Sequence, residues 1–455
     1  MLIKRAEING NELVDVWVKD GRIADVRPAE LSAASKTTVD VTIDASGCCV
    51  LPGLHDHHFH FFALLAHRSS IDCSGDLSQI ERACAQAPGN GWLRGVGYHE
   101  HAAGELDRAS LSAVCPDRPL RLQHSSGKLW VLNDLGIELL NLMQVENPGV
   151  ERDYAGEPTG RLFRMDDWLR VHVPSTSAGL KDRNALVNEL YAYGITGFTD
   201  TSYSNDQAQV DELMRLDLDV YCMGNDSLAD GHLKIMLDED RLPDIDFVIQ
   251  RVCQAHDKSR NVAFHCVSHV ELLYLLEVME QAGSSPGDRI EHGGVIPAEL
   301  VSRIGDLGMT VVTQPGFLAD RGGRFLDRLP ADQHCDLYPY RRLLEAGIPV
   351  VASSDAPYGP LSPWEVTNAA MTRRTEDGRI ANGDECVDFF DVIRGYLTYA
   401  RSPGRLSRQI AQGVPANLCI LDCRSSELAN RAGDNPVRHT VFNGELVYSR
   451  DDRIS

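Results

Sequence analysis

Four histidines stand within six positions of the stretch LPGLHDHHFH, residues 51–60. Its apolar beginning, with a Pro-Gly pair, predicts a short strand. Side chains of a strand alternate between two faces, so His58 and His60 point one way while His57 and Phe59 point the other. Neutral imidazole is a common ligand of zinc-like ions, and two imidazoles on one rigid strand can begin a metal site. The spacing alone leaves a merely polar strand end as the alternative.

The middle of the chain alternates strand-like and helix-like stretches, which together would position these histidines. The candidate strands are residues 51–58, 195–200, 218–223, 233–237, 262–266, 289–292, 310–314 and 349–354. The amphipathic stretches between them include residues 182–193, 206–216, 244–256, 269–282, 297–307 and 337–346. Eight strand–helix units predict a (β/α)8 TIM barrel of the α/β class, whose active site lies at the carboxyl ends of the strands.

Polar residues of metal-ligand type occur on several of these predicted strands or at their ends. Besides His58 and His60 they are Lys234, His265, His292 and the Ser354-Asp355 pair. Each residue alone has a structural explanation, such as a core histidine or a helix cap. Six suitable groups at the same ends of five strands are better explained by one shared site, and they are the ligand types of a two-metal hydrolytic centre.

The two ends of the chain differ from its middle. Residues 1–50 and 406–455 carry short runs of alternating apolar and polar residues, separated by Asn-Gly and Asp-Gly pairs typical of hairpins. Neither segment can bury its own apolar face, so we expect them to form one small β-sandwich domain together. The barrel then occupies residues 51–405, with an interruption at about 70–175.

Composition bounds the class of protein. The chain has 455 residues, 43% hydrophobic and 24% charged, as in a globular protein. No apolar stretch has the length of a membrane span, and the first residues are too polar for a signal peptide. The net charge of −22 argues against nucleic acid or a membrane as partner. Twelve cysteines without CxxC spacing indicate reduced thiols, and we expect a cytoplasmic protein.

The line PGLHDHHFH resembles the first-strand pattern PGxxDxHxH of the amidohydrolase superfamily of metal-dependent hydrolases, with Asp56 at the aspartate. The residues that this resemblance assigns to the metal centre are His58, His60, Lys234, His265, His292 and Asp355. It implies two Zn²⁺ ions bridged by a carboxylated Lys234, although other divalent metals fit the same ligands. It also implies that Asp355 is the catalytic residue.

Motifs elsewhere resemble the branch of that superfamily that includes N-substituted formamide deformylase, among them RIEHGG at residues 289–294 and SDAP at 354–357. In that branch an insertion lies over the barrel mouth, and residues 70–175 would form it here. Candidate substrate contacts are Tyr98, His124, Lys128, Trp130 and Gln314. The pair Gly127-Lys128 departs from the branch's usual Gly-His, so the resemblance does not carry a substrate over.

The implied reaction is hydrolysis of a non-peptide C–N bond, the amide of a small molecule, by a metal-activated hydroxide. Asp355 would accept the proton of the water and pass it to the leaving nitrogen. A one-metal deaminase and a lactone or ester hydrolase are alternatives on the same barrel, and a non-catalytic binding scaffold is an alternative of another class. Deaminases of this type place a glutamate shortly after the fifth-strand histidine, whereas Glu271 stands further on. The resemblance also favours a homodimer.

Overall fold

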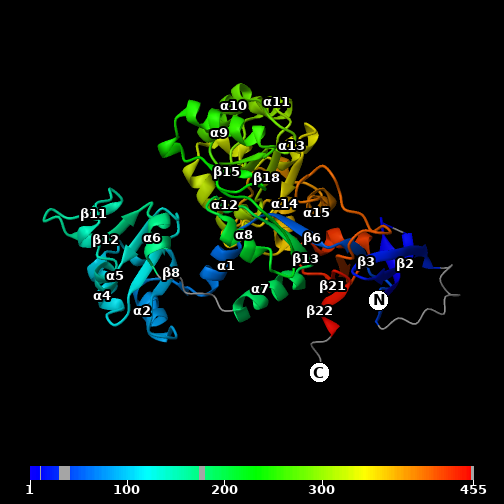
Figure 1. The fold of residues 1–455 in the computed structure, drawn as a ribbon, viewed down its shortest axis with the longest axis horizontal. Coiled ribbons are helices and arrows are strands. Elements are labelled where there is room, and N and C mark those ends of the chain that lie inside the picture. The colour runs from blue at the N-terminus through cyan, green and yellow to red at the C-terminus, as the bar shows by residue number, and fades with distance from the viewer. Residues whose placement is uncertain (11, 30–40, 174–179, 452–455) are drawn as a thin grey trace. The chain divides into compact units, whose positions relative to one another are not determined.

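The computed structural model describes residues 1–10, 12–29, 41–173 and 180–451 (Figure 1). They form two compact units, one joining residues 1–61 to 184–455 and the other comprising residues 62–183. The predicted insertion at about 70–175 corresponds to the second unit, and its position over the barrel mouth stays a prediction. Parts of the predicted segments, residues 11, 30–40, 174–175 and 452–455, lie outside the described residues.

Eight parallel strands build the barrel of the first unit. They are β6 (Leu54–Phe59), β13 (Ile195–Asp200), β14 (Asp219–Cys222), β15 (Leu233–Met236), β16 (Val262–Cys266), β17 (Arg289–His292), β18 (Thr310–Thr313) and β19 (Val350–Ala352). Two ladders, β14-β13-β6 and β15-β16-β17-β18-β19, make up the wall. A parallel bridge between Gly224 and Leu233 joins them on one side, and the Asp355 N–H donates to the His58 carbonyl at 2.9 Å on the other. The predicted (β/α)8 barrel is confirmed.

Helices follow the strands and cover the outside of the barrel, as α9, α10 and α11 do beside β15 to β18 in Figure 1. The helices are α7 (Leu180–Ala192), α8 (Gln207–Leu213), α9 (Ile245–Asp257), α10 (His269–Ala282), α11 (Val301–Asp306), α12 (Gly316–Arg328), α13 (Tyr340–Glu345), α14 (Pro363–Thr372) and α15 (Phe389–Tyr396). Short 3-10 helices are η3 (Glu239–Arg241), η4 (Ala298–Leu300), η5 (Ala331–Asp336), η6 (Gly383–Glu385) and η7 (Ser425–Arg431). Side-chain caps such as Asp244 and Ser268 start α9 and α10 within a few residues of the preceding element.

The strand predicted over residues 51–58 is two strands in the structure. β5 (Val50–Pro52) pairs antiparallel with β20 (Leu418–Leu421), whereas β6 begins at Leu54 and pairs with β13. Gly53 separates them, and a Cβ there would collide with the side chain of Thr196. Glycine therefore lets the chain leave one sheet and enter the other at close range.

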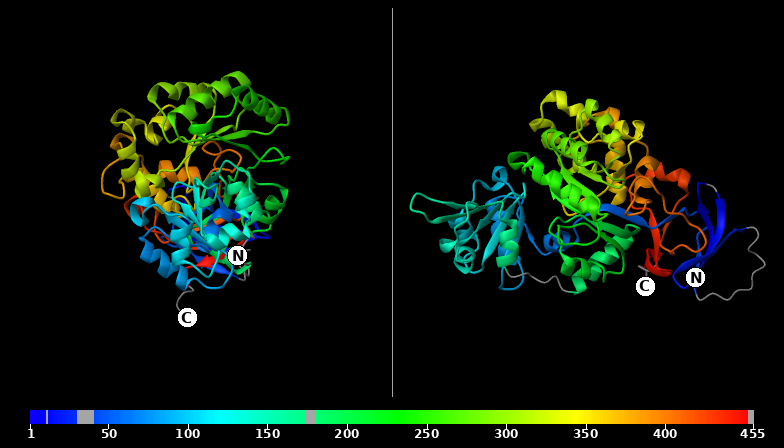
Figure 2. Two further views of the ribbon diagram at one scale, coloured as in Figure 1. Left: turned by 90° about the vertical axis from the view of Figure 1, so that its left-hand side faces the viewer. Right: turned by 45° about the horizontal axis from the view of Figure 1, so that its top comes forward.

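The two ends of the chain form two four-stranded sheets that share one apolar core, as predicted. One sheet has the order β3-β2-β1-β4, and the other β22-β21-β20-β5. The remaining bounds are β1 (Leu2–Ile8), β2 (Glu12–Lys19), β3 (Arg22–Pro28), β4 (Thr42–Asp44), β21 (Val437–Phe442) and β22 (Glu445–Ser449). Ile3 and Val16 of the first sheet pack in the same core as Leu418 and Val441 of the second. Figure 2 shows these blue and red strands side by side.

The second unit is a six-stranded sheet of order β11-β12-β10-β9-β8-β7, with its own buried apolar clusters. Its strands are β7 (Ile71–Asp72), β8 (Leu93–Tyr98), β9 (Leu120–His124), β10 (Leu129–Leu132), β11 (Val150–Arg152) and β12 (Pro158–Phe163). Its helices are α1 (Phe61–Arg68), which begins at the last residue of the first unit, α2 (Leu77–Gln86), α3 (Glu100–Ala103), α4 (Arg108–Val114), α5 (Asp134–Leu139), η2 (Leu142–Gln144) and α6 (Asp166–His172). Across the described part of the chain, no helix combines the length and apolarity needed to cross a membrane.

Candidate metal centre

The structure brings the predicted histidines of β6 and the aspartate after β19 to one point. Asp355 Oδ1 lies 3.4 Å from His58 Nε2 and 3.2 Å from His60 Nε2. Ligand atoms about 2.0–2.2 Å from a tetrahedral cation lie roughly 3.3–3.6 Å from one another. The spacing of Asp355 Oδ1 from each of the two nitrogens is thus close to that of neighbouring ligands of one ion. The side chain of His60 is 19% exposed and that of His58 only 1%, so the group is open on the side of His60.

His265 and His292, at the carboxyl ends of β16 and β17, make a second pair beside the first. His292 Nε2 lies 2.9 Å from His265 Nδ1. The ring of His292 stands 4.8 Å from the ring of His58, and its Nδ1 is 3.8 Å from Asp355 Oδ2. His58, His292 and Asp355 form a buried triad in which one ligand atom from each lies within 4.8 Å of the others. The four histidines therefore surround one small volume at the strand ends.

Lys234 on β15 is buried near this volume, with an exposed fraction of 4%. Its Nζ has no hydrogen-bond partner among the described residues. Burial lowers the pKa of the lysine to about 8, and the positive charge of Arg289 adds to this, whereas Glu291 and Asp355 oppose it. A buried amine without a partner is costly, which indicates that another group completes its surroundings.

The backbone is strained at two of the candidate ligands. His292 has a φ of 74° and Asp355 a φ of 52°, in the left-handed region that side chains other than glycine seldom occupy. Each such residue costs about 1–3 kcal/mol, and residues of this kind cluster at functional sites. The two side chains meet, with His292 Nδ1 3.8 Å from Asp355 Oδ2.

Glu291 is a part of the centre that the sequence reasoning missed. It stands one residue before His292 on β17 and is fully buried. Its Oε2 accepts a hydrogen bond of 2.5 Å from His58 Nδ1, and its Oε1 lies 2.8 Å from Arg289 Nε. Burial, the largest single influence, raises the pKa of Glu291, but the charges of Arg289, Lys234 and neighbouring histidines together lower it below its ordinary value. The carboxylate holds the Nδ1 proton of His58 and leaves the Nε2 lone pair directed at Asp355.

Gln314 orients His292 by accepting its Nδ1 proton, as Glu291 orients His58. His292 Nδ1 donates to Gln314 Oε1 at 2.7 Å, and Gln314 Nε2 donates to Ser353 Oγ at 3.0 Å. Sequence reasoning named Gln314 as a substrate contact. The structure places it against a candidate ligand, and its contact with a substrate stays a prediction.

Three of the candidate ligands, His58, His265 and His292, are neutral imidazoles. Burial, the largest cause in each case, lowers the pKa of His265 to about 3 and holds those of His58 and His292 well below their ordinary value. The neutral ring is the form that binds metal, because protonation removes the lone pair. The arrangement is therefore ready to receive a cation at neutral pH.

Three of the predicted substrate contacts lie together in the second unit. Tyr98, His124 and Lys128 line one pocket of about 260 Å³. The Tyr98 hydroxyl donates to the Gly104 carbonyl and accepts from the Leu106 N–H, so its polar group is already engaged. Trp130 lies outside this pocket in an apolar cluster, where its Nε1 donates to Asp166. Their roles toward a substrate stay predictions.

Glu271, the glutamate closest after His265, has a structural position. It is 5% exposed and caps α10. Its carboxylate accepts the backbone N–H groups of Val267 at 2.6 Å, Ser268 at 3.1 Å and Glu239 at 3.1 Å. These three bonds hold the start of α10 against the segment after β15, and they occupy the oxygens that a proton shuttle would use.

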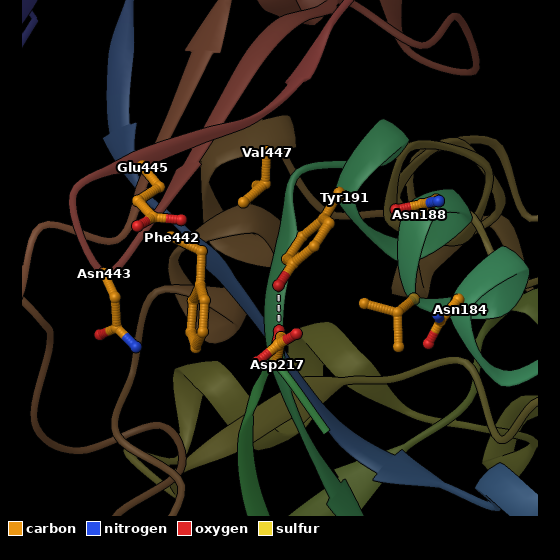
Figure 3. A pocket seen from close by; sticks show the side chains of 9 residues that line it. Asn184, Asn188, Tyr191, Asp217, Phe442, Asn443, Glu445 and Val447 are labelled. Atoms are coloured by element: carbon orange, nitrogen blue, oxygen red, sulfur yellow. Dashed lines mark hydrogen bonds between the residues drawn. The ribbon is translucent and has the colours of Figure 1, made fainter. Parts of the chain in front are cut away.

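Another pocket, this one in the first unit, lies between α7, the segment before β14 and the β21–β22 hairpin (Figure 3). It has a volume of about 510 Å³ and is lined by side chains such as Asn188, Phe442 and Glu445. The Tyr191 hydroxyl donates to the Asp217 carbonyl across its floor. Its lining residues include none of the metal-centre side chains, so this larger hollow is separate from the candidate chemistry.

Comparison with known proteins agrees with this geometry. A family model described as the amidohydrolase family matches residues 41–448. An N-substituted formamide deformylase from Arthrobacter pascens is 27% identical over 96% of this chain and 95% of its own. A putative amidohydrolase from Bacillus subtilis is 23% identical over 97% of both chains. The crystal structure of an uncharacterized metal-dependent hydrolase from Pyrococcus horikoshii superposes with a TM-score of 0.73 at 19% identity, over 92% of this chain and 97% of that one.

Proposed function

We infer the function from the premise that this chain belongs to the amidohydrolase family, whose model matches residues 41–448. It is a metal-dependent hydrolase of that superfamily. Within this class we propose that it hydrolyses the C–N bond of a small N-acyl amine. N-substituted formamides are the first substrates to test, because the relative from Arthrobacter pascens is named for that reaction.

The observation that carries the proposal is the pair of unpartnered polar atoms among the four histidines. Lys234 Nζ and Asp355 Oδ1 are buried and lack hydrogen-bond partners among the described residues. Imidazole nitrogens with carboxylate oxygens are the donor set of Zn²⁺ and similar cations. His58, His60 and Asp355 would hold one ion and His265 with His292 the other, with a carbamate on Lys234 between them.

Two such cations, when bound, supply Lewis acidity that lowers the pKa of water and polarises a carbonyl oxygen. The protein side chains then handle the proton. Asp355 stands at the opening beside His60, where its carboxylate can accept a proton from the attacking water and return it to the leaving nitrogen. An amine leaves poorly as an anion, so this return is needed more for an amide than for an ester.

Lys234 is suited to carry the bridging charge. With a pKa of about 8, about a tenth of its amine is neutral at pH 7, far more than for an ordinary lysine. The neutral amine attacks carbon dioxide, a C–N bond forms, and one proton leaves to give a carbamate with two oxygens. The product is negatively charged and resembles a carboxylate, which the positive charges of two cations would stabilise in a buried position.

The position of Glu271 supports hydrolysis over deamination. A deaminase on this barrel would need a carboxylate near His265 that is free to move protons. The carboxylate of Glu271 instead accepts hydrogen bonds from three backbone N–H groups. Glu271 is the glutamate that the sequence offered for this proton-transfer role.

The test is a panel of N-substituted formamides, longer N-acyl amines, lactones and simple esters, followed by mass spectrometry. Protein stripped of metal should be inactive, and added Zn²⁺ should restore C–N cleavage. Asp355→Asn keeps the shape of the side chain but lacks its basicity, so its turnover should fall by roughly 10²–10⁴-fold. Cleavage of esters and lactones without any amide would favour the ester-hydrolase alternative, and a stripped enzyme of undiminished activity would contradict metal dependence.

A further inference from the structure

The second unit carries a histidine cluster that the barrel chemistry does not use. His99 and His101 flank Glu100 directly after β8, and His124 ends the neighbouring strand β9. β8 and β9 are parallel, and their register pairs Tyr98 with His124. The pairing therefore brings His124 beside the His99–His101 segment, although 22 positions separate His124 from the last of these residues.

Three residues of this cluster bring their ligand atoms together, and His124 adjoins them through Glu100. His99 Nδ1 lies 3.1 Å from His101 Nδ1 and 3.5 Å from Glu100 Oε2. Glu100 Oε2 in turn lies 2.8 Å from His124 Nε2. His99, Glu100 and His101 each offer one ligand atom within 4.8 Å of the others. Separations of 3.1 and 3.5 Å are close to the roughly 3.3–3.6 Å between neighbouring ligands of a tetrahedral cation.

We propose that His99, Glu100, His101 and His124 form a second metal site, which binds one divalent cation of the zinc class. Three imidazole nitrogens with one carboxylate oxygen suit Zn²⁺ and its neighbours in the first transition series. The same set suits Mg²⁺ and Ca²⁺ poorly, because those ions prefer oxygen ligands throughout.

The charges of the cluster favour a cation. The Glu100 carboxylate supplies a negative charge beside three imidazole rings, and its Oε2 lies 2.8 Å from His124 Nε2. His124 Nδ1 accepts from the backbone N–H of Ser126 at 3.0 Å and lies 2.7 Å from Ser126 Oγ, so the ring is held with Nε2 turned toward Glu100.

Binding would replace two contacts of His99 Nδ1. His99 Nδ1 accepts from the backbone N–H of His101 at 3.2 Å and faces the His101 ring at 3.1 Å. The lone pair of His99 Nδ1 thus faces both the backbone N–H and the ring of His101, and a bound cation would replace both of these contacts. The bound ion would tie the end of β8 to the end of β9 at the pocket lined by Tyr98, Glu100, His124 and Lys128.

The experiment uses the full-length chain with the barrel ligands removed as His58→Ala, His60→Ala and His265→Ala. After treatment with a chelator, the protein is titrated with Zn²⁺ against a chromophoric competitor. One Zn²⁺ per chain should still bind. Adding His101→Ala should weaken this binding at least tenfold. With Co²⁺ in place of Zn²⁺, the background variant should show the visible spectrum of tetrahedral Co²⁺, and the His101→Ala variant should not.

His172→Ala is the matched control, because it removes another exposed histidine of the same unit. It should leave the Zn²⁺ affinity unchanged. If the background variant does not fold, His101→Ala in the otherwise natural chain should lose one Zn²⁺ per chain by elemental analysis and keep its C–N hydrolysis. Equal Zn²⁺ binding by His101→Ala and His172→Ala would overturn the proposal, whatever the barrel centre does.

Discussion

Lys234 is the residue on which the number of barrel cations depends. A carbamate bridges two ions, whereas an alanine leaves an apolar hole between them. Lys234→Ala should therefore bind one cation or none in the barrel and lose at least about 10²-fold in C–N hydrolysis. Added formate or acetate should restore part of both, since a small carboxylate fits the hole and replaces the missing charge. Metal analysis and initial rates measure the two effects.

Lys234→Arg is the matched control for this rescue. Its guanidinium stays charged and cannot form a carbamate, and it fills the space that a carboxylate would enter. Added formate should leave it inactive. Full metal content and activity in Lys234→Ala would show that no bridge forms at this position.

Glu291 offers a second prediction at the residue scale, one that concerns orientation. The His58 ring keeps its Nε2 lone pair toward Asp355 because Glu291 holds the Nδ1 proton at 2.5 Å. Glu291→Gln keeps the shape of the side chain but can present an N–H to the ring, which disfavours this tautomer. We expect a loss of metal affinity of about 10–100-fold.

The readout for Glu291→Gln is competitive titration with a chelator. Glu277→Gln, on the exposed face of α10, is a control that should leave the affinity unchanged. Unchanged affinity in Glu291→Gln as well would show that the carboxylate serves only the buried ion pair with Arg289.

At the scale of the element, the barrel strands were predictable because parallel strands are buried on both faces and appear as short apolar runs. All eight are present, and the four histidines and Asp355 lie near one another at their ends, while the metal-binding role of these residues and of Lys234 stays a prediction. The break at Gly53 was missed, since a glycine inside an apolar run has no separate signal until its neighbour Thr196 is known. Glu291 was missed because its partner His58 stands 233 positions away. Two charged residues, Arg289 and Glu291, in a four-residue strand expected to be buried were the signal that could have revealed it.

Gly53 gives a prediction about how the sandwich is joined to the barrel. The methyl group of Gly53→Ala would collide with buried Thr196 on β13. Relief requires β5 or β6 to shift, so the free energy of unfolding should fall by about 1–3 kcal/mol in chemical denaturation. Gly305→Ala, in α11 and without a close neighbour, is the control and should be neutral or stabilising by up to about 1 kcal/mol. Equal stability of the two variants would mean that the junction adapts freely.

The contact between α9 and the segment before β17 should make stability depend on pH. His256 Nε2 lies 3.1 Å from Asp288 Oδ2, and this hydrogen bond raises the pKa of His256 despite burial. A raised folded pKa stabilises the protein fully below the unfolded value of about 6.5, and the stabilisation is lost as pH rises through the folded pKa.

His256→Gln should therefore lower the free energy of unfolding by about 0.5–1 kcal/mol near pH 5.5 and much less near pH 9. Denaturant titration at both pH values measures the difference. A loss that is the same at both would assign the contact to neutral hydrogen bonding alone.

At the scale of the whole molecule, burial should decide which of the twelve cysteines react. All are free thiols, and only Cys335 is exposed, with Cys253 and Cys386 half-buried. Burial also raises the pKa of thiols such as Cys49 and Cys73 to about 12, which suppresses the reactive thiolate. Brief iodoacetamide treatment of the native protein should give one adduct, at Cys335, and Cys335→Ser should abolish it. Peptide mass spectrometry locates the adduct, and early labelling of buried Cys266 would show that the barrel opens in solution.

The sandwich shared by the two ends of the chain has a consequence for biosynthesis. β1 to β5 leave the ribosome before the barrel strands, yet the apolar face they share with β20 and β21 is covered only after residue 442 has been made. At about 5–20 residues per second, that interval is roughly 20–80 s. For this time the nascent sheet exposes Ile3, Val16 and Ile23. The barrel can fold during this interval, whereas the core of the sandwich is completed only after the barrel has been synthesised. Chaperones that bind exposed apolar strands can act on the nascent sheet throughout the interval.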